Sequence, residues 1–257
     1  MIILENTLDT LIPSLVDIVE KAGKLISDIY NDEFEVIKKE DGSPVTKADT
    51  LSHDLLKAEL ERLTPGVPVI SEEDESSWIV KSPQYWLVDP LDGTKGFIYK
   101  TGDFCINIAL MENDKPIFGL IHLPLTRETY YGFNGKAFRN LAGDLSPIHT
   151  RHFPANGLTL LLGGYGKKFK EQEDFFLKTY PITKIMRLRS AIKFCLIASG
   201  SADIYMRFEP CYEWDTAAGH ALLEAAGGIL TQVNGSPFLY GKTHLINEAF
   251  VAFGQKP

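Results

Sequence analysis

The sequence is poor in cysteine and has no long apolar run. Its three cysteines, Cys105, Cys195 and Cys211, form no Cys-x-x-Cys pair, and such a scattered, odd-numbered set is typical of a reducing compartment. No run approaches the roughly 18 apolar residues of a transmembrane helix, and no secretory leader pattern is visible. We therefore expect a cytoplasmic protein, with peripheral association with the cytoplasmic face of the inner membrane left open.

Basic residues are in the minority. The 257 residues include 26 lysines and arginines against 34 aspartates and glutamates, which gives a formal charge of −8. An acidic chain repels polyanions, so the composition argues against a nucleic-acid polymer as a partner. It still allows a small anionic substrate, because bound cations reverse the charge locally. The oligomeric state stays open.

The first part of the chain begins with two helix patterns. Apolar residues recur at helical spacing over 11–29 and 46–63, and Thr46 with Asp49 resembles a capping box at the second start. Strand-like segments follow at 67–70, 85–88, 104–111, 117–123 and 129–133.

The stretch 134–154 is rich in glycine, proline and asparagine and shows no periodicity, which predicts a domain junction. Beyond it, strand-like and helix-like segments alternate, as is typical of α/β architecture. They lie at 158–162, 171–177, 184–188, 191–199, 203–207, 216–226, 229–232 and 250–253. We expect an N-terminal α+β half over residues 1–150 and a C-terminal α/β half over residues 151–257.

Two acidic clusters directly follow strand-like runs. They are Ser71-Glu-Glu-Asp74 and Leu87-Val-Asp-Pro-Leu-Asp-Gly-Thr94. Their carboxylates Glu72, Asp89 and Asp92 are hard oxygen ligands, which suit Mg²⁺ better than zinc or copper. One such turn alone is as easily a solvated surface feature, but two clusters behind apolar strands favour a metal site.

A third acidic segment is Glu213-Trp-Asp-Thr-Ala-Ala-Gly-His220. Asp215 could simply cap the helix that follows, yet the adjacent tryptophan and small residues indicate a helix that approaches its surroundings closely. Asp49 also allows two interpretations, as a first-turn carboxylate favoured by the helix dipole or as a catalytic base.

These motifs, in this order, resemble the inositol monophosphatase superfamily of Mg²⁺-dependent, lithium-sensitive phosphatases. The resemblance rests on Trp86–Thr94 and Trp214–Gly219. Within the superfamily the chain is similar to bacterial 3′(2′),5′-bisphosphate nucleotidases of the CysQ type. The matching segments are Asp41–Asp49, Ser71–Asp74, Asp92–Lys95 and Lys193–Leu196. The resemblance implies a layered αβαβα sandwich of the sugar phosphatase type, with the active site between its halves.

The resemblance also implies the ligands of two or three Mg²⁺ ions. Glu72, Asp89 and the backbone carbonyl of Leu91 would hold the first ion. Asp89, Asp92 and Asp215 would hold the second, and Glu72 would share a third with solvent. So many carboxylates in one place require cations to neutralise them.

Further roles follow from the same resemblance. Asp49 and Thr94 would orient and deprotonate the attacking water, and the backbone N–H groups of Gly93 and Thr94 would bind phosphate. Glu73 would lie next to the metal ligands without itself binding the metal. In-line phosphoryl transfer needs little beyond such positioning and charge stabilisation.

Three residues of the C-terminal half bear on the substrate. The resemblance places Ser190, Lys193 and Arg207 at the nucleotide-binding positions of the bisphosphate nucleotidases, where Lys with Arg would supply donors for a second phosphate. The alternative is that Lys193 and Arg207 are solvated surface charges. The implied reaction removes the 3′-phosphate of adenosine 3′,5′-bisphosphate, with 3′-phosphoadenosine 5′-phosphosulfate as a further candidate substrate and a place in sulfur metabolism. One departure is Gly96, where that branch usually has glutamate, which bears on the third metal.

Two other functions stay open. One is an inositol or sugar phosphate phosphatase on the same scaffold, and the other is a non-catalytic protein that binds nucleotide or Mg²⁺. The presence of both Asp49 and Thr94 speaks against the second, since binding alone needs no water-activating pair. Phosphatases with a cysteine nucleophile or an aspartyl-phosphate, and P-loop proteins, lack their motifs here.

Overall fold

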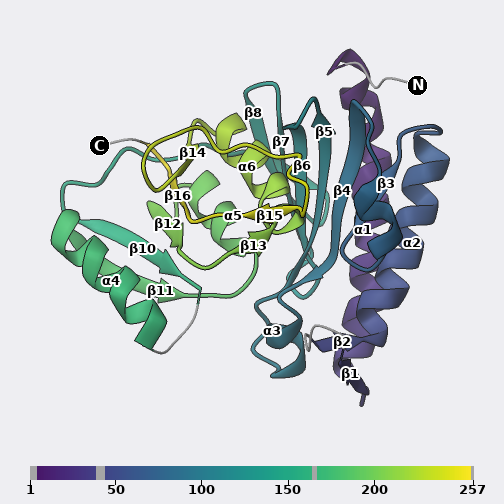
Figure 1. Cartoon of the computed structure of the whole chain (residues 1–257), viewed down its shortest axis with the longest axis horizontal. Helices are drawn as coiled ribbons and strands as arrows, with labels where there is room; N and C mark the ends of the chain where they lie inside the picture. The colour runs from purple at the N-terminus through teal and green to yellow at the C-terminus, as the bar shows by residue number, and fades with distance from the viewer. Residues whose placement is uncertain (1–4, 39–43, 164–166, 256–257) are drawn as a thin grey trace.

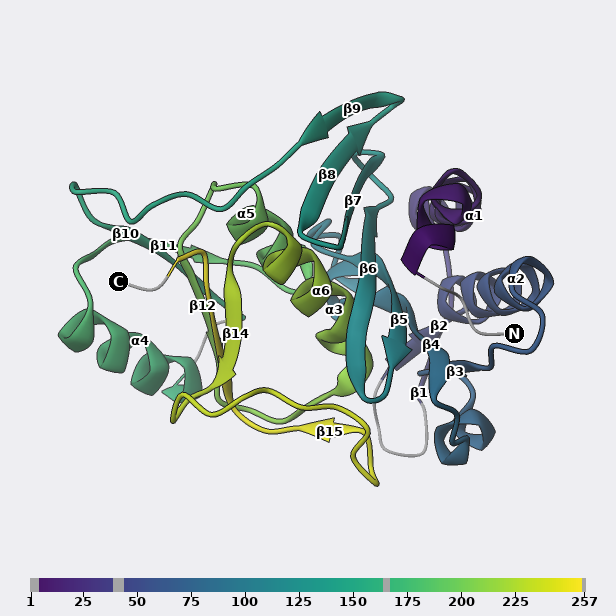
Figure 2. The same ribbon diagram turned by 90° about the horizontal axis from the view of Figure 1, so that it is seen from above.

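The computed structural model describes residues 5–38, 44–163 and 167–255. Its helices and two large sheets alternate in five layers, which Figures 1 and 2 show from two directions. Helices α1 and α2 cover the outer face of a seven-stranded sheet, α5 and α6 lie between that sheet and a five-stranded one, and α4 covers the far side. This is the αβαβα sandwich expected from the sequence.

The two outer helices follow the predicted patterns. Helix α1 is Glu5–Asn31 and α2 is Lys47–Leu63. The hydroxyl of Thr46 accepts a hydrogen bond from the N–H of Ala48, and the N–H of Thr46 donates to the carboxylate of Asp49. The predicted capping box is therefore present. Residues 41–43 of the segment Asp41–Asp49 lie outside the described residues.

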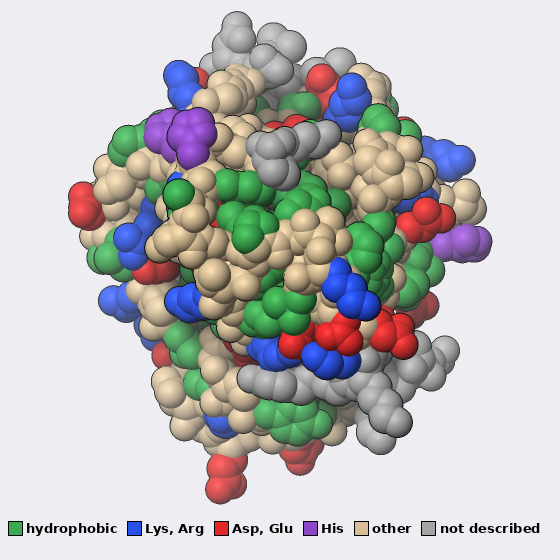
Figure 3. All heavy atoms as spheres, turned by 90° about the vertical axis from the view of Figure 1, so that its left-hand side faces the viewer, with side chains coloured by type: hydrophobic (Ala, Val, Ile, Leu, Met, Phe, Trp, Pro, Cys, Tyr) green, Lys and Arg blue, Asp and Glu red, His purple; other side chains and the backbone are tan. Residues whose placement is uncertain are grey.

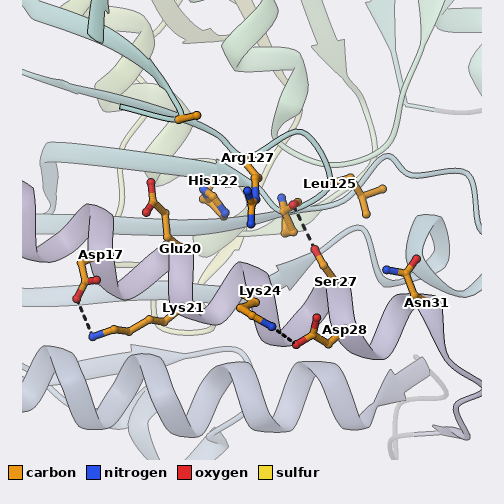
Figure 4. A pocket seen from close by; sticks show the side chains of 12 residues that line it. Asp17, Glu20, Lys21, Lys24, Ser27, Asp28, Asn31, His122, Leu125 and Arg127 are labelled. Atoms are coloured by element: carbon orange, nitrogen blue, oxygen red, sulfur yellow. Dashed lines mark hydrogen bonds and ion pairs between the residues drawn. The ribbon is translucent and has the colours of Figure 1, made fainter. Parts of the chain in front are cut away.

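A shallow pocket runs between α1 and the turn that joins β6 to β7 (Figure 4). Along α1 it is lined by charged side chains that pair with each other, Asp17 with Lys21 and Lys24 with Asp28. All four side chains are more than half exposed. Such exposed pairs contribute little to stability.

The seven-stranded sheet has its strands in sequence order, from β3 to β9. The strands are β3 Val69–Ser71, β4 Gln84–Asp92, β5 Cys105–Glu112, β6 Lys115–Leu123, β7 Glu128–Phe133, β8 Lys136–Leu141 and β9 Asp144–Pro147. β3 and β4 are parallel, and every later neighbour is antiparallel. The predicted hairpin over residues 104–123 is therefore confirmed.

Strands β8 and β9 lie within residues 134–154, the stretch without periodicity in which the sequence predicted a domain junction. They form the edge of the sheet, and every residue of β9 is exposed. Without a buried face, an edge strand has no alternation of polar and apolar residues for sequence reasoning to detect.

The five-stranded sheet has the order β11-β10-β12-β16-β14. β10 is parallel to β11 and β12, whereas β16 is antiparallel to both β12 and β14. The strands are β10 Leu158–Leu162, β11 Ile182–Arg187, β12 Ile204–Arg207, β14 Ile229–Gln232 and β16 Phe250–Phe253, and the helices are α4 Lys167–Thr179, α5 Ile192–Ala198 and α6 Ala217–Ala225.

Short elements complete the described chain. They are β1 Val36–Lys38, β2 Pro44–Thr46, η1 Glu75–Ile79, α3 Thr94–Ile98, β13 Cys211–Tyr212, η2 Glu213–Asp215 and β15 Ile246–Asn247. Within the described residues, no helix combines the length and the apolar character needed to cross a bilayer.

Glycines let α6 lie directly on the seven-stranded sheet. A Cβ at Gly119 of β6 would lie 2.1 Å from the carbonyl oxygen of Ala218, and one at Gly132 of β7 would lie 2.7 Å from the Cα of Leu222. Side chains at these positions would push the helix away. The close approach that the small residues after Trp214 predicted is therefore present.

One hydrophobic core joins the two sheets. It includes Leu87 and Ala109 from the N-terminal half together with Phe194 and Leu222 from the C-terminal half. The boundary expected near residue 150 falls between β9 and β10, in a segment outside both sheets. The division of the chain into these two halves stays a prediction.

The outer face on the α4 side mixes both signs of charge with scattered hydrophobic side chains (Figure 3). Phe175 and Leu177 of α4 are among the exposed hydrophobic residues. Single exposed hydrophobic side chains are ordinary on protein surfaces and imply no binding site by themselves.

Candidate active site

Three carboxylates from the two halves of the chain meet where the end of β4 contacts η2. Ligand oxygens of Asp89, Asp92 and Asp215 all lie within 4.8 Å of one another. Residues three apart on a regular strand point to opposite faces, but the pairing of β4 with β5 shifts register between Asp89 and Asp92. This irregularity lets both aspartates reach the same site.

The cluster is electrostatically unfavourable without cations. Burial raises the pKa of Asp89 well above its usual range, and the charges of Glu72, Asp92 and Asp215 raise it further. Burial also raises the pKa of Asp215 to about 6, although Arg207 opposes the rise. Hard oxygen ligands in such a buried acidic group fit a divalent cation such as Mg²⁺.

Glu72 and Glu73 follow β3, which runs parallel to β4. The N–H of Glu72 donates to the carbonyl of Val88 at 3.2 Å, so its backbone lies beside Asp89. Both glutamates are half-buried, and the charge of Glu73 helps to raise the pKa of Asp49. The predicted metal ligand and its neighbour therefore both border the cluster.

The carboxylate of Asp92 is held by three donors that all reach Oδ2. They are the N–H of Ala191 at 2.5 Å, Nδ2 of Asn107 at 3.1 Å and Sγ of Cys105 at 3.8 Å. These contacts fix the orientation of the Asp92 carboxylate, which would help to hold a cation. Asn107 also lies 3.5 Å from the carbonyl of Trp214, the residue before Asp215.

Asp49 and Thr94 face each other beside the cluster. The hydroxyl of Thr94 lies 3.2 Å from Oδ1 of Asp49 and 3.3 Å from the carbonyl of Leu91. Oδ2 of Asp49 accepts from the N–H and hydroxyl of Thr46 at 2.7 and 2.6 Å. Burial raises the pKa of Asp49 to about 6, and the Thr46 hydrogen bonds limit the rise. Asp49 thus caps α2 with one oxygen and meets Thr94 with the other.

Gly93 directly precedes the short helix α3 and adopts the left-handed backbone conformation, with φ of 91°. A Cβ at this position would lie only 2.7 Å from the backbone oxygen of Asp103. Both the conformation and the close approach require glycine. The N–H groups of Gly93 and Thr94, predicted to bind phosphate, follow Asp92 directly.

The three predicted nucleotide-binding residues border the same site. Ser190 has a φ of 59° in the turn before α5. Lys193 is 2% exposed, and its ammonium donates to the carbonyls of Leu188, at 3.1 Å, and Ser190. Burial lowers its pKa to about 8. Nη1 of Arg207 lies 3.6 Å from the carboxylate of Asp215.

Comparison with known proteins gives the family. Residues 7–255 match the inositol monophosphatase family. The chain belongs to this family. It is 38% identical to the 3′(2′),5′-bisphosphate nucleotidase CysQ of Escherichia coli (strain K12) over 227 residues, which are 87% of this chain and 91% of the relative. It is 34% identical to the CysQ nucleotidase of Buchnera aphidicola over 257 residues, covering 97% and 96% of the two chains.

A solved structure agrees with these relatives. CysQ from Bacteroides thetaiotaomicron, a bacterial member of the inositol monophosphatase family, superposes with a TM-score of 0.82 at 32% identity, covering 94% of this chain and 96% of that one. The inositol monophosphatase family is metal-dependent, and the carboxylates of Asp89, Asp92 and Asp215 form a group that can hold a metal ion.

Sequence reasoning missed several residues that shape the site of this inositol monophosphatase family member. Asn107 and Asp103 are two, and a third is Lys242, which neutralises the fully buried Glu213 at 3.1 Å. The N–H groups of Gly241 and Lys242 each donate to the same carboxylate at 3.0 Å. Glu213 begins the turn that ends at Asp215. A polar residue inside a buried strand is the one signal that could have found Asn107.

Proposed function

We propose that this protein is a Mg²⁺-dependent phosphomonoesterase that removes the 3′-phosphate of adenosine 3′,5′-bisphosphate. The observation that carries the proposal is the cluster of Asp89, Asp92 and Asp215 beside the Asp49–Thr94 pair. The chain that presents this arrangement is 38% identical to a 3′(2′),5′-bisphosphate nucleotidase over most of its length.

The ligand set is part of the proposal. Glu72, Asp89 and the carbonyl of Leu91 would hold one Mg²⁺, and Asp89, Asp92 and Asp215 would hold another, with Glu72 shared by a third. When bound, the ions supply positive charge that neutralises the carboxylates, acidifies the attacking water and stabilises the leaving oxygen.

The side chains of Thr94 and Asp49 transfer one proton. The oxygen of Thr94 accepts the proton of the attacking water while its own hydroxyl hydrogen passes to Oδ1 of Asp49. With a pKa of about 6, Asp49 is ionised near neutral pH and still basic enough to accept that proton. The N–H groups of Gly93 and Thr94 bind the phosphate oxygens. The water oxygen bonds to phosphorus and the ester bond to the 3′ oxygen breaks. The departing oxygen takes up a proton from solvent and Asp49 returns its proton to solvent, so that a free hydroxyl and inorganic phosphate result.

Recognition of the second phosphate falls to Arg207 in this proposal. Its guanidinium already borders the cluster at Asp215, and a planar fork of donors matches phosphate geometry. Lys193 contributes positive charge while its ammonium holds the Ser190 turn through two carbonyls. Clearance of the nucleotide by-product of sulfate assimilation is the role that this substrate implies.

The deciding experiment measures phosphate release from adenosine 3′,5′-bisphosphate and from inositol 1-phosphate in parallel. We expect strong preference for the nucleotide, loss of activity with a chelator, recovery with Mg²⁺ and inhibition by Li⁺. A third assay with 3′-phosphoadenosine 5′-phosphosulfate ranks the two nucleotides. Preference for inositol 1-phosphate would keep the phosphatase and discard the nucleotide, and absence of turnover would favour a binding protein.

A further inference from the structure

The turn Leu188–Ala191, which presents Ser190, is held from the opposite half of the chain by two carboxylates. The N–H of Arg189 donates to Oδ2 of Asp103 at 2.7 Å, and the N–H of Ala191 donates to Oδ2 of Asp92 at 2.5 Å. Hydrogen bonds from backbone N–H groups to carboxylates are among the stronger ones. Alternate N–H groups of this turn therefore bind the N-terminal half.

Two carbonyls of the turn face Lys193. Its ammonium accepts no hydrogen bond and donates to the carbonyls of Leu188 and Ser190. Between these contacts, Ser190 adopts a φ of 59°, a left-handed conformation that residues other than glycine rarely take. The turn keeps this conformation because charged groups bind it on both sides.

Asp103 is itself fixed on the opposite side of the contact. Its side chain is only 13% exposed, and Oδ1 accepts from the hydroxyl of Thr101. A Cβ at Gly96 would lie 2.5 Å from Oδ1 of Asp103 and 2.8 Å from its backbone oxygen. The glycine that departs from the pattern of the nucleotidase branch thus provides the space in which Asp103 lies.

We propose that Asp103 is a positioning residue for nucleotide recognition, because it fixes the turn that presents Ser190 and orients Lys193. The inference rests on the proposed function, since it assumes that this turn borders the nucleotide. Asp92 holds the same turn but also belongs to the metal cluster, so its replacement would disturb both. Asp103 contacts the turn and not the cluster carboxylates, and its replacement separates the two effects.

The test compares Asp103→Ala with the unchanged protein. The readouts are kcat and KM for adenosine 3′,5′-bisphosphate, the dissociation constant of adenosine 5′-monophosphate, and the Mg²⁺ concentration for half-maximal activity. Asp103→Ala removes a charge-assisted hydrogen bond and also the ion pair between Asp103 and Nη1 of Arg189 at 3.5 Å. We expect KM and the dissociation constant to rise about tenfold or more. We expect kcat and the Mg²⁺ requirement to stay within about twofold, because neither the metal ligands nor the Asp49–Thr94 pair changes.

Two further variants approach the same contact differently. Gly96→Ala adds the Cβ that would collide with Asp103, so it should raise KM as Asp103→Ala does. Asp103→Asn keeps an oxygen for the N–H of Arg189 and should recover most of the loss. If Asp103→Ala fails to fold, these two variants decide the matter. Asp144→Ala, at an exposed position of β9, removes a carboxylate from the same half and should change nothing.

The outcomes distinguish the inference from the proposed function. If the protein without substitutions neither hydrolyses the bisphosphate nor binds adenosine 5′-monophosphate, both the proposed function and the inference are overturned. A normally active protein whose Asp103→Ala variant behaves like Asp144→Ala would overturn the inference alone. A fall in kcat with unchanged KM would also overturn it, because the residue would then act on the reaction centre and not on nucleotide binding.

Discussion

The hydroxyl of Thr94 lies 3.2 Å from Oδ1 of Asp49, although 45 positions separate the two residues in the sequence. The contact joins the first turn of α2 to the first residue of α3. The other oxygen of Asp49 binds Thr46 and caps α2. The helix cap therefore holds Asp49 in place, and its second oxygen is aimed at Thr94.

This pairing predicts the effect of removing either partner. Asp49→Asn and Thr94→Val should each lower kcat for the bisphosphate by roughly 10²- to 10⁴-fold, the usual contribution of a general base. Both variants should still fold. In Asp49→Asn, the asparagine still offers an oxygen to the N–H of Thr46. Thr94→Ser keeps the hydroxyl and should retain most activity.

A matched control lies on the same helix. Asp54 is an exposed residue of α2, and Asp54→Asn should leave kcat unchanged. Thermal melting of each variant separates loss of chemistry from loss of structure. Full activity in Asp49→Asn would remove this residue from the mechanism.

Asn107 provides the second prediction. Its Nδ2 donates to Oδ2 of Asp92 and so helps to fix the orientation of this carboxylate, which would help to hold a cation. Asn107→Leu removes this donor from a fully buried strand and should weaken Mg²⁺ binding about 10- to 100-fold, as is typical when a residue that orients a metal ligand is lost. Titration calorimetry with Mg²⁺ on the chelator-treated protein measures the effect without reference to catalysis.

The interpretation of that variant depends on two comparisons. Asn107→Asp should weaken Mg²⁺ binding less than Asn107→Leu, because it also loses the donor to Asp92 but adds a negative charge that attracts the cation. Asn140 of β8, far from the cluster in the strand order of the same sheet, offers a control in Asn140→Leu. Unchanged Mg²⁺ affinity in both Asn107 variants would mean that Ala191 and Cys105 suffice to hold Asp92.

Most of the candidate metal ligands could be predicted from the sequence because their signals are local. Asp89 and Asp92 lie in one motif behind an apolar run, and the capping box at Thr46 and Asp49 spans four residues. Asn107 was missed because its role arises from antiparallel pairing, which sets β5 against β4 and brings the asparagine to Asp92. No local pattern encodes such a contact.

The guanidinium of Arg189 forms a longer ion pair with Asp103 at 3.5 Å. The hydrogen bond from the backbone N–H of Arg189 to Asp103 is harder still to predict, because 86 positions separate the residues. Any residue except proline at position 189 would provide the same donor. The contacts of Lys193 were equally hard to predict, because the two backbone carbonyls that it binds come together only when the Ser190 turn has formed. The sequence predicted a nucleotide-binding role for Lys193 but not its hydrogen-bond partners.

Arg207 provides the third prediction. Arg207→Ala should raise KM for adenosine 3′,5′-bisphosphate at least tenfold, because the second phosphate loses charged donors. The KM for inositol 1-phosphate, which has one phosphate, should change much less. Because Arg207 also neighbours Asp215, both substrates must be measured at saturating Mg²⁺. Equal losses on the two substrates would show that Arg207 serves the metal site alone.

The fourth prediction concerns pH. Burial raises the pKa of both Asp49 and Asp215 to about 6, above the value of about 3.9 for an unfolded aspartate. A raised folded-state pKa means that the folded protein binds more protons than the unfolded chain between these values. The associated stability is present at low pH and is lost as pH rises through about 6.

In the chelator-treated protein, the free energy of unfolding should therefore fall by about 1 kcal/mol per group between pH 5 and pH 7. Urea unfolding at the two pH values measures the change. Mg²⁺ should reverse the trend, because it binds the ionised carboxylates and stabilises the folded state. Asp215→Asn should flatten the pH dependence, and an unaltered slope in that variant would contradict the assignment.

The last prediction concerns an ion pair that lies outside the candidate site. Asp203 is completely buried, and its carboxylate accepts from Nε and Nη2 of Arg151 at 2.8 and 2.7 Å and from the N–H of Thr159 at 2.7 Å. The side chain of Arg151 is 37% exposed. The two partners therefore differ in how easily each reaches water when the other is removed.

This asymmetry predicts an order of effects on the free energy of unfolding. Arg151→Ala leaves a buried carboxylate without its cation and should cost about 3 to 5 kcal/mol. Asp203→Asn removes the charge while Arg151 turns to solvent, so it should cost less, about 1 to 3 kcal/mol. The exposed pair of Lys24 and Asp28 (Figure 4) supplies the comparison, since Lys24→Ala should cost under about 1 kcal/mol. Urea unfolding ranks the three variants, and a smaller cost for Arg151→Ala than for Asp203→Asn would show that Thr159 alone suffices to stabilise the buried charge.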